Sequence, residues 1–210
     1  PPFVCAQIAS RYMRATTAYS DYRQLGIVVS QMRREREAAP SKRGAVTPSA
    51  DAVVVHVRAG DVMDLPANLP GVGGNFRGVL RAEDVLAGRG PGTMAHYVYP
   101  LSFYTQLIPT LPPHVKLCYI CAGAQFRSDH GWPVSTAYVN GIRDALVQRG
   151  FRVRAMVGRN PDDEVLFMSA AKHFIRAGGG YSAVVAALVQ RNGGQVHWDG
   201  HPGNGIWPAG

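Results

Sequence analysis

The residues of this chain best suited to chemistry are His56, Arg58, Gly60 and Asp61, which follow a run of valines. An arginine guanidinium stays charged and presents a planar fork of N–H donors that fits phosphate oxygens. Glycine lets a ligand approach the backbone closely, and an aspartate can orient the arginine or cap the turn. Because side chains alternate along a strand, His56 and Arg58 are expected on one face. The spacing therefore indicates a site for a phosphate-bearing ligand.

A second candidate segment is Gly179-Gly180-Tyr181-Ser182, directly before a helix that we expect to begin at Ala183. Glycines between a strand and a helix leave backbone N–H groups open, and the helix N-terminus adds a positive partial charge. These four residues are therefore expected to hold a diphosphate from the side opposite Arg58.

A third candidate is the acidic turn Asp162-Asp163-Glu164, which follows Pro161 at the start of another expected helix. A carboxylate of Asp163 or Glu164 could accept hydrogen bonds from the N1–H and N2–H groups of a guanine. Acidic residues in a first helical turn are also explained by the helix dipole alone.

The other two patterns also have plain structural explanations when each is taken alone. A His-x-Arg pair on a strand can be a satisfied structural pair, and a Gly-Gly-Gly run can be only a turn. The functional hypothesis rests on the order in which the three patterns occur along the chain.

The elements that must position these residues alternate between strand and helix. Valine-rich and aromatic runs predict strands, amphipathic runs predict helices, and Pro and Gly mark their ends. The expected N-caps are Ser102 for one helix and Ser135 or Thr136 for the next. After the valine strand that begins at residue 52, the expected strands are 115–122, 151–157, 173–177 and 195–198, and the expected helices are 103–108, 137–148, 161–171 and 183–190. This alternation predicts an α/β fold, a Rossmann-like and mostly parallel sheet with helices on both faces.

The expected organisation is one main domain with additions. Residues 1–50 are predicted to be a helical N-terminal segment, and residues 51–196 the Rossmann-like domain. Within it, residues 62–96 form a Gly- and Pro-rich insertion that is too long for an ordinary connection, with a short helix near 81–86. Residues 197–210 are expected to be a tail, although His197 and His201 in it could form a metal-binding pair.

The motif His56-x-Arg58-x-Gly60-Asp61 resembles the His-x-Arg-x-Gly-Asp motif of α1,2-fucosyltransferases and, more loosely, that of α1,6- and protein O-fucosyltransferases. Residues 168–188 are similar to the late segment of this superfamily, where Lys-His and Ile-x-Ala-Asn precede Ser-Ser-Phe-Ser and an Ala-rich helix. Residues 99–104 resemble its Tyr-containing helix. The matches extend over roughly residues 50–195.

The resemblance implies a two-domain GT-B glycosyltransferase whose C-terminal domain binds GDP-fucose. It makes Arg58 the catalytic residue, which binds the β-phosphate and stabilises the departing GDP as a metal would elsewhere. His56, Gly60 and Asp61 would then contact the donor, and the segment from Gly179 to Ser182 would hold its phosphates or ribose. The implied reaction is inverting transfer of fucose to a glycan or protein hydroxyl, with no metal or other cofactor. Residues 1–50 would be a remnant of the acceptor domain.

The chain departs from the family pattern in its late segment. Gly179 and Gly180 replace the two serines, Gly178 replaces the asparagine, and Ala183-Val184 replaces an aromatic pair. Two alternatives therefore stay open. One is a glycosyltransferase that uses another sugar nucleotide, and the other is an inactive module that binds glycans or polyanions.

Composition favours an anionic partner, because the formal net charge is +8 and the pI is about 9.8. We expect a nucleotide-sugar donor and a glycan or glycoprotein acceptor, rather than a nucleic acid. The resemblance implies the Golgi or endoplasmic reticulum lumen in a eukaryote, and the cytoplasm in a bacterium, with any membrane anchor outside these residues.

Cys118 and Cys121 lie three apart on one expected strand and so face opposite sides, which argues against a zinc or redox pair.

Overall fold

The computed structural model describes residues 47–64, 81–89, 98–122, 132–159 and 161–198. The expected N-terminal helical segment, most of the insertion and nearly all of the tail lie outside these residues. The strands are β1 (Ala52–His56), β2 (Leu117–Cys121), β3 (Arg152–Met156), β4 (His173–Ile175) and β5 (Gln195–His197). The helices are α3 (Asp61–Asp64), α4 (Ala82–Leu86), α5 (Leu101–Leu107), the 3₁₀ turn η3 (Ile108–Thr110), α6 (Pro133–Gln148), α7 (Pro161–Met168) and α8 (Gly180–Arg191).

The five strands form one parallel sheet in the order β3-β2-β1-β4-β5. The chain therefore moves outward from β1 through β2 to β3, and then returns to the other side of β1 for β4 and β5. This arrangement confirms the predicted α/β, Rossmann-like fold. The order in which strands are added changes side between β1 and β4, although all strands run parallel. Sheets of this kind bind ligands outside the carboxyl ends of the strands, at the point where the strand order reverses.

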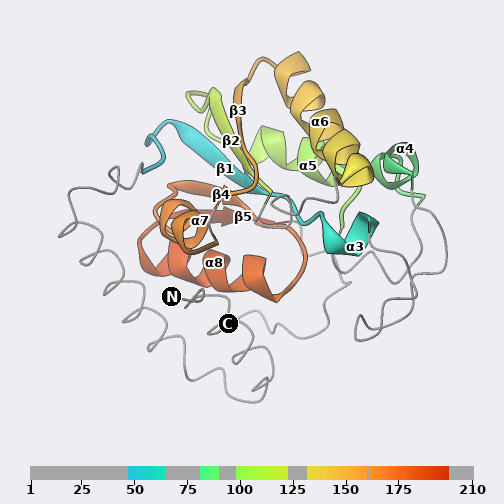
Figure 1. The fold of residues 1–210 in the computed structure, drawn as a ribbon. Coiled ribbons are helices and arrows are strands. Elements are labelled where there is room, and N and C mark those ends of the chain that lie inside the picture. The colour runs from blue at the N-terminus through green and yellow to red at the C-terminus, as the bar shows by residue number, and fades with distance from the viewer. Residues whose placement is uncertain (1–46, 65–80, 90–97, 123–131, 160, 199–210) are drawn as a thin grey trace.

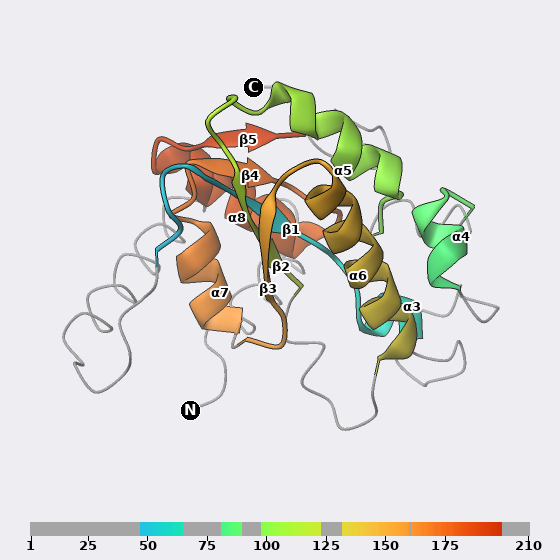
Figure 2. The ribbon, with the colours of Figure 1, turned by 90° about the horizontal axis from the view of Figure 1, so that it is seen from above.

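Two apolar layers enclose the sheet, as expected of parallel strands that are buried on both faces. Val53 and Val55 of β1 pack into one layer with α5 and α6, whereas Ala52 and Val54 pack into the other with α7 and α8. The two views in Figures 1 and 2 show these helix pairs on opposite sides of the sheet. Cys118 and Cys121 belong to different layers, which confirms that they face opposite ways.

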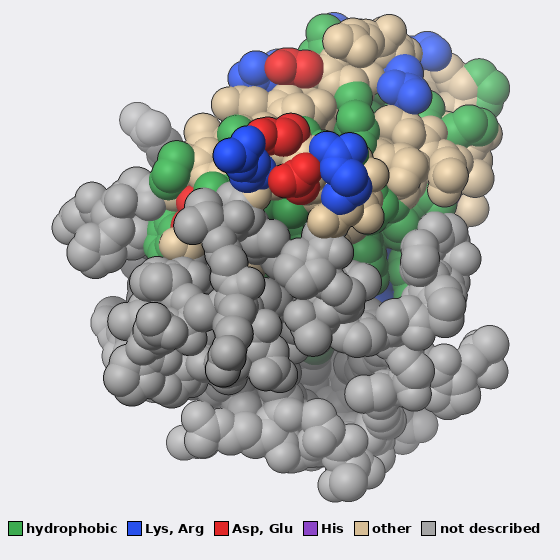
Figure 3. All heavy atoms as spheres, turned by 90° about the vertical axis from the view of Figure 1, so that its right-hand side faces the viewer, with side chains coloured by type: hydrophobic (Ala, Val, Ile, Leu, Met, Phe, Trp, Pro, Cys, Tyr) green, Lys and Arg blue, Asp and Glu red, His purple; other side chains and the backbone are tan. Residues whose placement is uncertain are grey.

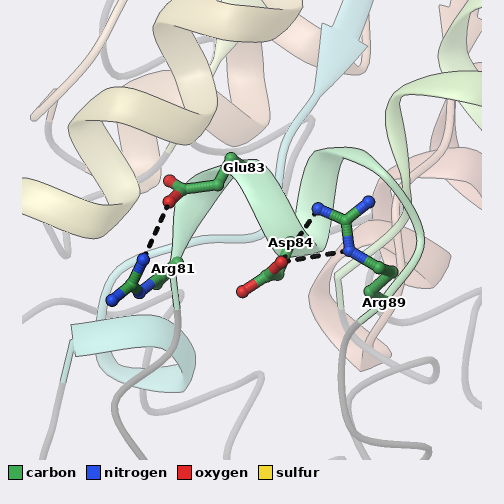
Figure 4. Close-up of polar contacts among 4 residues, drawn as sticks. All are labelled: Arg81, Glu83, Asp84 and Arg89. Atoms are coloured by element: carbon green, nitrogen blue, oxygen red, sulfur yellow. Dashed lines mark hydrogen bonds and ion pairs between the residues drawn. The ribbon is translucent and has the colours of Figure 1, made fainter.

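The short helix predicted near 81–86 is α4, and it packs against α6. A Cβ atom at Gly141 of α6 would lie 2.5 Å from Leu86 Cδ1, so the missing side chain allows this close approach. Two exposed ion pairs lie on and beside α4, Arg81–Glu83 and Arg89–Asp84 (Figure 4). Basic and acidic side chains therefore lie side by side on this face of the molecule (Figure 3).

The N-caps expected for the two helices after residue 100 are both wrong. Helix α5 begins at Leu101 after Pro100, so Ser102 lies inside its first turn. Helix α6 begins at Pro133, which places Ser135 and Thr136 inside it as well. Proline is favoured at the start of a helix because its missing N–H would have no partner there. Among the described residues, no helix is long and apolar enough to cross a membrane.

Candidate functional site

The two segments singled out in the sequence follow the neighbouring strands β1 and β4, at the point where the strand order reverses. His56 is the last residue of β1, and the loop from Arg176 to Gly179 follows β4. Val55 pairs with Ile175, so both segments leave the sheet at the same level. Because these strand ends flank the reversal, this is the place in the fold where a ligand site is expected.

His56 is buried at the end of β1, with 3% of its surface exposed. Burial, with a smaller contribution from the Arg58 charge, lowers its pKa from 6.5 to about 3. The imidazole is therefore neutral at ordinary pH, and its Nδ1 has no hydrogen-bond partner among the described residues. A neutral ring of such low basicity is suited to binding by hydrogen bonds and is a poor general base.

Arg58 is half-buried just beyond the strand, and its Nη1 donates to the Ala59 carbonyl at 3.3 Å. Val57 and Ala59 face the α5–α6 layer, so the alternation of β1 continues through Arg58. Arg58 and His56 therefore share the opposite face, as predicted. Their proximity also explains the contribution of Arg58 to the low pKa of His56.

Gly60 turns the chain after Arg58. Its φ of 80° lies in the left-handed region that favours glycine. The Gly60 N–H donates to Ser135 Oγ at 2.7 Å, which ties the turn to the start of α6. The proposed role of Gly60 as a place of close ligand approach stays a prediction.

Asp64, at the end of α3, provides the N-terminal cap that sequence analysis assigned to Ser135 or Thr136. Its carboxylate accepts the N–H groups of Val134 at 2.8 Å and Ser135 at 2.9 Å, together with the Ser135 hydroxyl. A carboxylate there satisfies open N–H groups and complements the helix dipole. The loop after β1 is thus clamped to α6 through Asp64, Ser135 and Gly60. Asp61 opens α3, and its side chain lies outside the described residues.

The glycine-rich segment after β4 differs from its prediction, because α8 begins at Gly180 instead of Ala183. Gly179 precedes the helix with a φ of 84°, a conformation that suits glycine and not serine. The Ser182 hydroxyl accepts the Ala177 N–H at 2.9 Å and so folds the loop back on the helix. Gly179, directly before the helix, has no side chain that could cap α8. The loop after β4 thus leads directly into a helix N-terminus, as the sequence predicted.

Tyr181 joins the candidate segments. Its ring centroid lies 5.4 Å from that of His56, and its hydroxyl donates to the Pro161 carbonyl at 3.1 Å. The end of β1, the start of α8 and the start of α7 therefore meet at the carboxyl edge of the sheet. The structure brings together the three patterns that the sequence placed far apart.

The two acidic candidates differ in exposure. Glu164 is fully buried in the α7–α8 layer, near Cys121 at the end of β2. Burial raises the pKa of the Cys121 thiol, and the Glu164 charge adds to that rise. Asp163 is half-buried beside it. A nucleobase can therefore reach Asp163 more readily than Glu164.

Sequence analysis missed Arg176 and Trp198. Arg176 follows β4 directly, next to the end of β1, and is 6% exposed. Its guanidinium lies 4.5 Å from the Trp198 ring, a cation–π contact between the ends of β4 and β5. The run His-Phe-Ile-Arg carries the same signal as His56-Val57-Arg58, a basic residue at the end of an apolar strand.

The expected tail also begins later than position 197. His197 is the last residue of β5 and is 4% exposed, so the packed sheet includes it. Within the described residues, no three His, Cys, Asp or Glu side chains are placed to hold a metal ion.

Comparison with known protein families finds no model that matches this chain, and comparison with curated proteins finds no significant match.

Proposed function

We propose that this chain binds the donor of a fucosyltransferase-like glycosyltransferase, with GDP-fucose as the donor and Arg58 as the residue that stabilises the departing GDP. The observation that supports this most is the meeting of His56, Tyr181 and the start of α7 at the reversal point of the sheet. The resemblance assigns phosphate, ribose and guanine contacts to these same three segments. Fucose would be transferred to a glycan or protein hydroxyl with inversion of configuration at its anomeric carbon, and GDP would be the leaving group.

A half-buried arginine just beyond β1, together with a helix N-terminus that follows the neighbouring strand β4, favours a diphosphate ligand. Positive charge from both sources would stabilise the negative charge that develops on GDP as the glycosidic bond breaks. His56, neutral and buried, can add a hydrogen bond without adding charge. The half-buried Asp163 is the better placed of the two carboxylates to accept the guanine N–H groups.

The direct test is the effect of GDP on thermal unfolding. GDP at a hundred times its dissociation constant is expected to raise Tm by about 5–10 °C, whereas UDP and ADP have little effect. Arg58→Ala is expected to weaken GDP binding at least 30-fold, since loss of a charged hydrogen-bonding partner costs about 2–5 kcal/mol. Arg58→Lys should fall between, because lysine keeps the charge and loses the planar fork.

Hydrolysis of GDP-fucose measures the chemistry separately, because water can replace an unidentified acceptor. Arg58→Ala should lose this activity. If GDP gives no shift in Tm, the donor assignment is wrong. If UDP or ADP gives the larger shift, the chain uses a different sugar nucleotide, which the glycines at 179 and 180 permit.

A polyanion-binding module is the second candidate, and exposed arginines on the edge strand favour it. Arg152 and Arg154 of β3 are exposed on one face of that strand, and the exposed Lys116 precedes β2 beside them. Heparin binding that weakens with salt and with Arg152→Ala/Arg154→Ala would support it. These two substitutions also serve as controls for Arg58→Ala, since they should leave GDP binding unchanged.

A further inference from the structure

The outer edge of β3 lies at one end of the sheet, two strands away from β1. Among the described residues, β3 pairs with β2 alone. Figure 2 shows it between α6 on one side and α7 on the other. The Arg152 N–H donates to the Lys116 carbonyl at 2.8 Å, so it points toward β2. Because backbone groups alternate in direction along a strand, the N–H and C=O groups of Val153 and Ala155 point away from β2, where another strand can pair with them.

The two faces of β3 differ in chemistry. Val153 packs against the α5–α6 layer, and Met156 packs against the α7–α8 layer. Alternation therefore places Arg152 and Arg154 on the face of Met156. Ala155 lies on the opposite face, with Val153. Since Arg152, Arg154 and Ala155 are all exposed, a strand added to this edge would meet positive charge on one face and apolar side chains on the other.

The two arginines can accept an acidic partner. Arg152 lies near the exposed Asp51, whose pKa is lowered chiefly by the hydrogen bond from Ser49 and to a smaller extent by the Arg152 charge. Within the part of the chain that the structure describes, neither Arg152 nor Arg154 forms an ion pair. Both guanidinium groups can therefore present their planar fork of donors to a carboxylate.

Two exposed valines lie next to this strand. Val147 is 52% exposed and Val157 is 37% exposed, and no other large apolar side chain among the described residues is as exposed. Val147 lies in the last turn of α6, which leads into β3, and Val157 follows β3 directly. Charged side chains on an edge strand can serve to prevent aggregation. Exposed valines do not serve that purpose, and covering them would be favourable.

We propose that the outer edge of β3 binds an extended segment of a partner protein in which acidic and apolar residues alternate. The segment would extend the five-stranded sheet by one strand. Its backbone would bond to the outward N–H and C=O groups of Val153 and Ala155. Its carboxylates would pair with Arg152 and Arg154, and its apolar side chains would lie beside Ala155.

Two other occupants match this edge less well. In a second copy of this chain, the paired β3 strands would bring the arginines of both copies onto one shared face, and like charges there are unfavourable. A sulfated glycan would pair with the arginines, but it would leave the open backbone groups and the valines without a role. The alternating segment is the occupant that uses all three features.

The first test is fluorescence anisotropy of a labelled peptide, Glu-Val repeated four times, titrated with the full chain at fixed ionic strength. The control peptide has the same composition, with four glutamates followed by four valines. The alternating peptide should bind about 10-fold more tightly, because only this order places every carboxylate on one face of a strand. Arg152→Ala/Arg154→Ala should weaken its binding about 10-fold. Arg81→Ala/Arg89→Ala removes the same charge from around α4 and should leave binding unchanged.

The second test concerns the backbone. Ala155→Pro removes an outward N–H and spares the hydrogen bonds to β2, since proline is tolerated on an edge strand when its nitrogen faces solvent. Binding of the alternating peptide should fall about 10-fold, because strand pairing is lost, whereas heparin binding should stay unchanged. If this variant fails to fold, the wild-type protein is titrated with two peptides, one N-methylated at every valine and the other at every glutamate. Only one of them should bind, since every second N–H of an added strand faces β3.

Three results would overturn the proposal. Equal affinity for the alternating and the block peptide, or peptide binding unchanged by Ala155→Pro, would mean that the arginines attract polyanions without strand pairing. Equal binding of the two N-methylated peptides would mean the same. Dimerisation of the chain in sedimentation that Ala155→Pro abolishes would assign the edge to a second copy. The donor assignment is tested separately, because none of these variants changes a residue of the candidate donor site.

Discussion

At the scale of single residues, the candidate site depends on one charged group and one neutral group at the end of the same strand. Arg58 keeps its charge under all ordinary conditions, whereas burial and the nearby Arg58 keep His56 uncharged. If both groups bind the donor, the site offers a fixed positive charge beside a donor of hydrogen bonds. Such a pairing is better suited to binding a phosphate group than to general acid–base catalysis.

The buried His56 should make the protein sensitive to acid. Its pKa is about 3 in the folded chain and about 6.5 when unfolded, so below pH 6.5 the unfolded chain binds a proton that the folded chain does not. The contribution of His56 to the free energy of unfolding therefore falls as pH decreases from 6.5, by about 1.4 kcal/mol per pH unit, until the folded pKa is reached. Denaturant titrations at pH 7 and pH 5 measure this loss.

The matched control is His56→Gln, which keeps a polar side chain that does not titrate. Between pH 7 and pH 5 it should lose about 2 kcal/mol less stability than the wild type. Equal losses in the two proteins would mean that His56 is not buried as described.

At the scale of elements, the position of the Arg58 loop depends on the cap of α6. Asp64 lies about 70 residues before the helix it caps, and the Gly60 turn bonds to the same Ser135. A change in the cap should therefore reach the candidate site, although neither Asp64 nor Ser135 contacts a ligand in the proposal.

Asp64→Ala should lower the free energy of unfolding by about 1–2 kcal/mol, the usual cost of losing an N-cap. Asp64→Asn keeps one acceptor oxygen and should cost less. Urea titration measures both, and hydrogen exchange should show faster exchange at the N–H groups of Val134 and Ser135. GDP binding should also weaken, because the turn that follows Arg58 loses its attachment to α6.

The exposed Asp84 on α4 provides the control for this experiment, since its ion pair with Arg89 lies in solvent (Figure 4). Asp84→Ala should change stability by less than about 1 kcal/mol. Equal effects of Asp64→Ala and Asp84→Ala would show that the contact with α6 adds no stability.

At the scale of the whole molecule, the sequence was sufficient for the fold because each strand is marked locally by apolar residues. The valine run at 52–55 and the run 117–121 are buried on both faces, which produces an unbroken apolar pattern. The alternation with helices then predicts parallel strands, whereas the order β3-β2-β1-β4-β5 was not predicted from the sequence.

The parts that were not predicted depend on contacts between distant residues. The cap of α6 comes from Asp64, far away in sequence, so a search for local caps chose Ser135 instead. Helix α8 is a local exception: it starts at Gly180, in a segment whose glycines suggested a loop, and the nearby Ala177 N–H donates to the Ser182 hydroxyl. The burial of Glu164 follows from how α7 is rotated against the sheet, which the charge pattern of one turn does not determine.

The two core layers should unfold together, because they share the strands of a single sheet. Val53 and Val54 test this, since they are adjacent, fully buried and packed into opposite layers. Val53→Ala and Val54→Ala each remove two buried methyl groups and should each lower the free energy of unfolding by about 2–3 kcal/mol. In this size range that is a fall in Tm of about 4–12 °C. Circular dichroism and tyrosine fluorescence should both record one transition at the same midpoint in each variant. Two separate transitions, or a loss confined to one layer, would mean that α5 and α6 stabilise the sheet independently of α7 and α8.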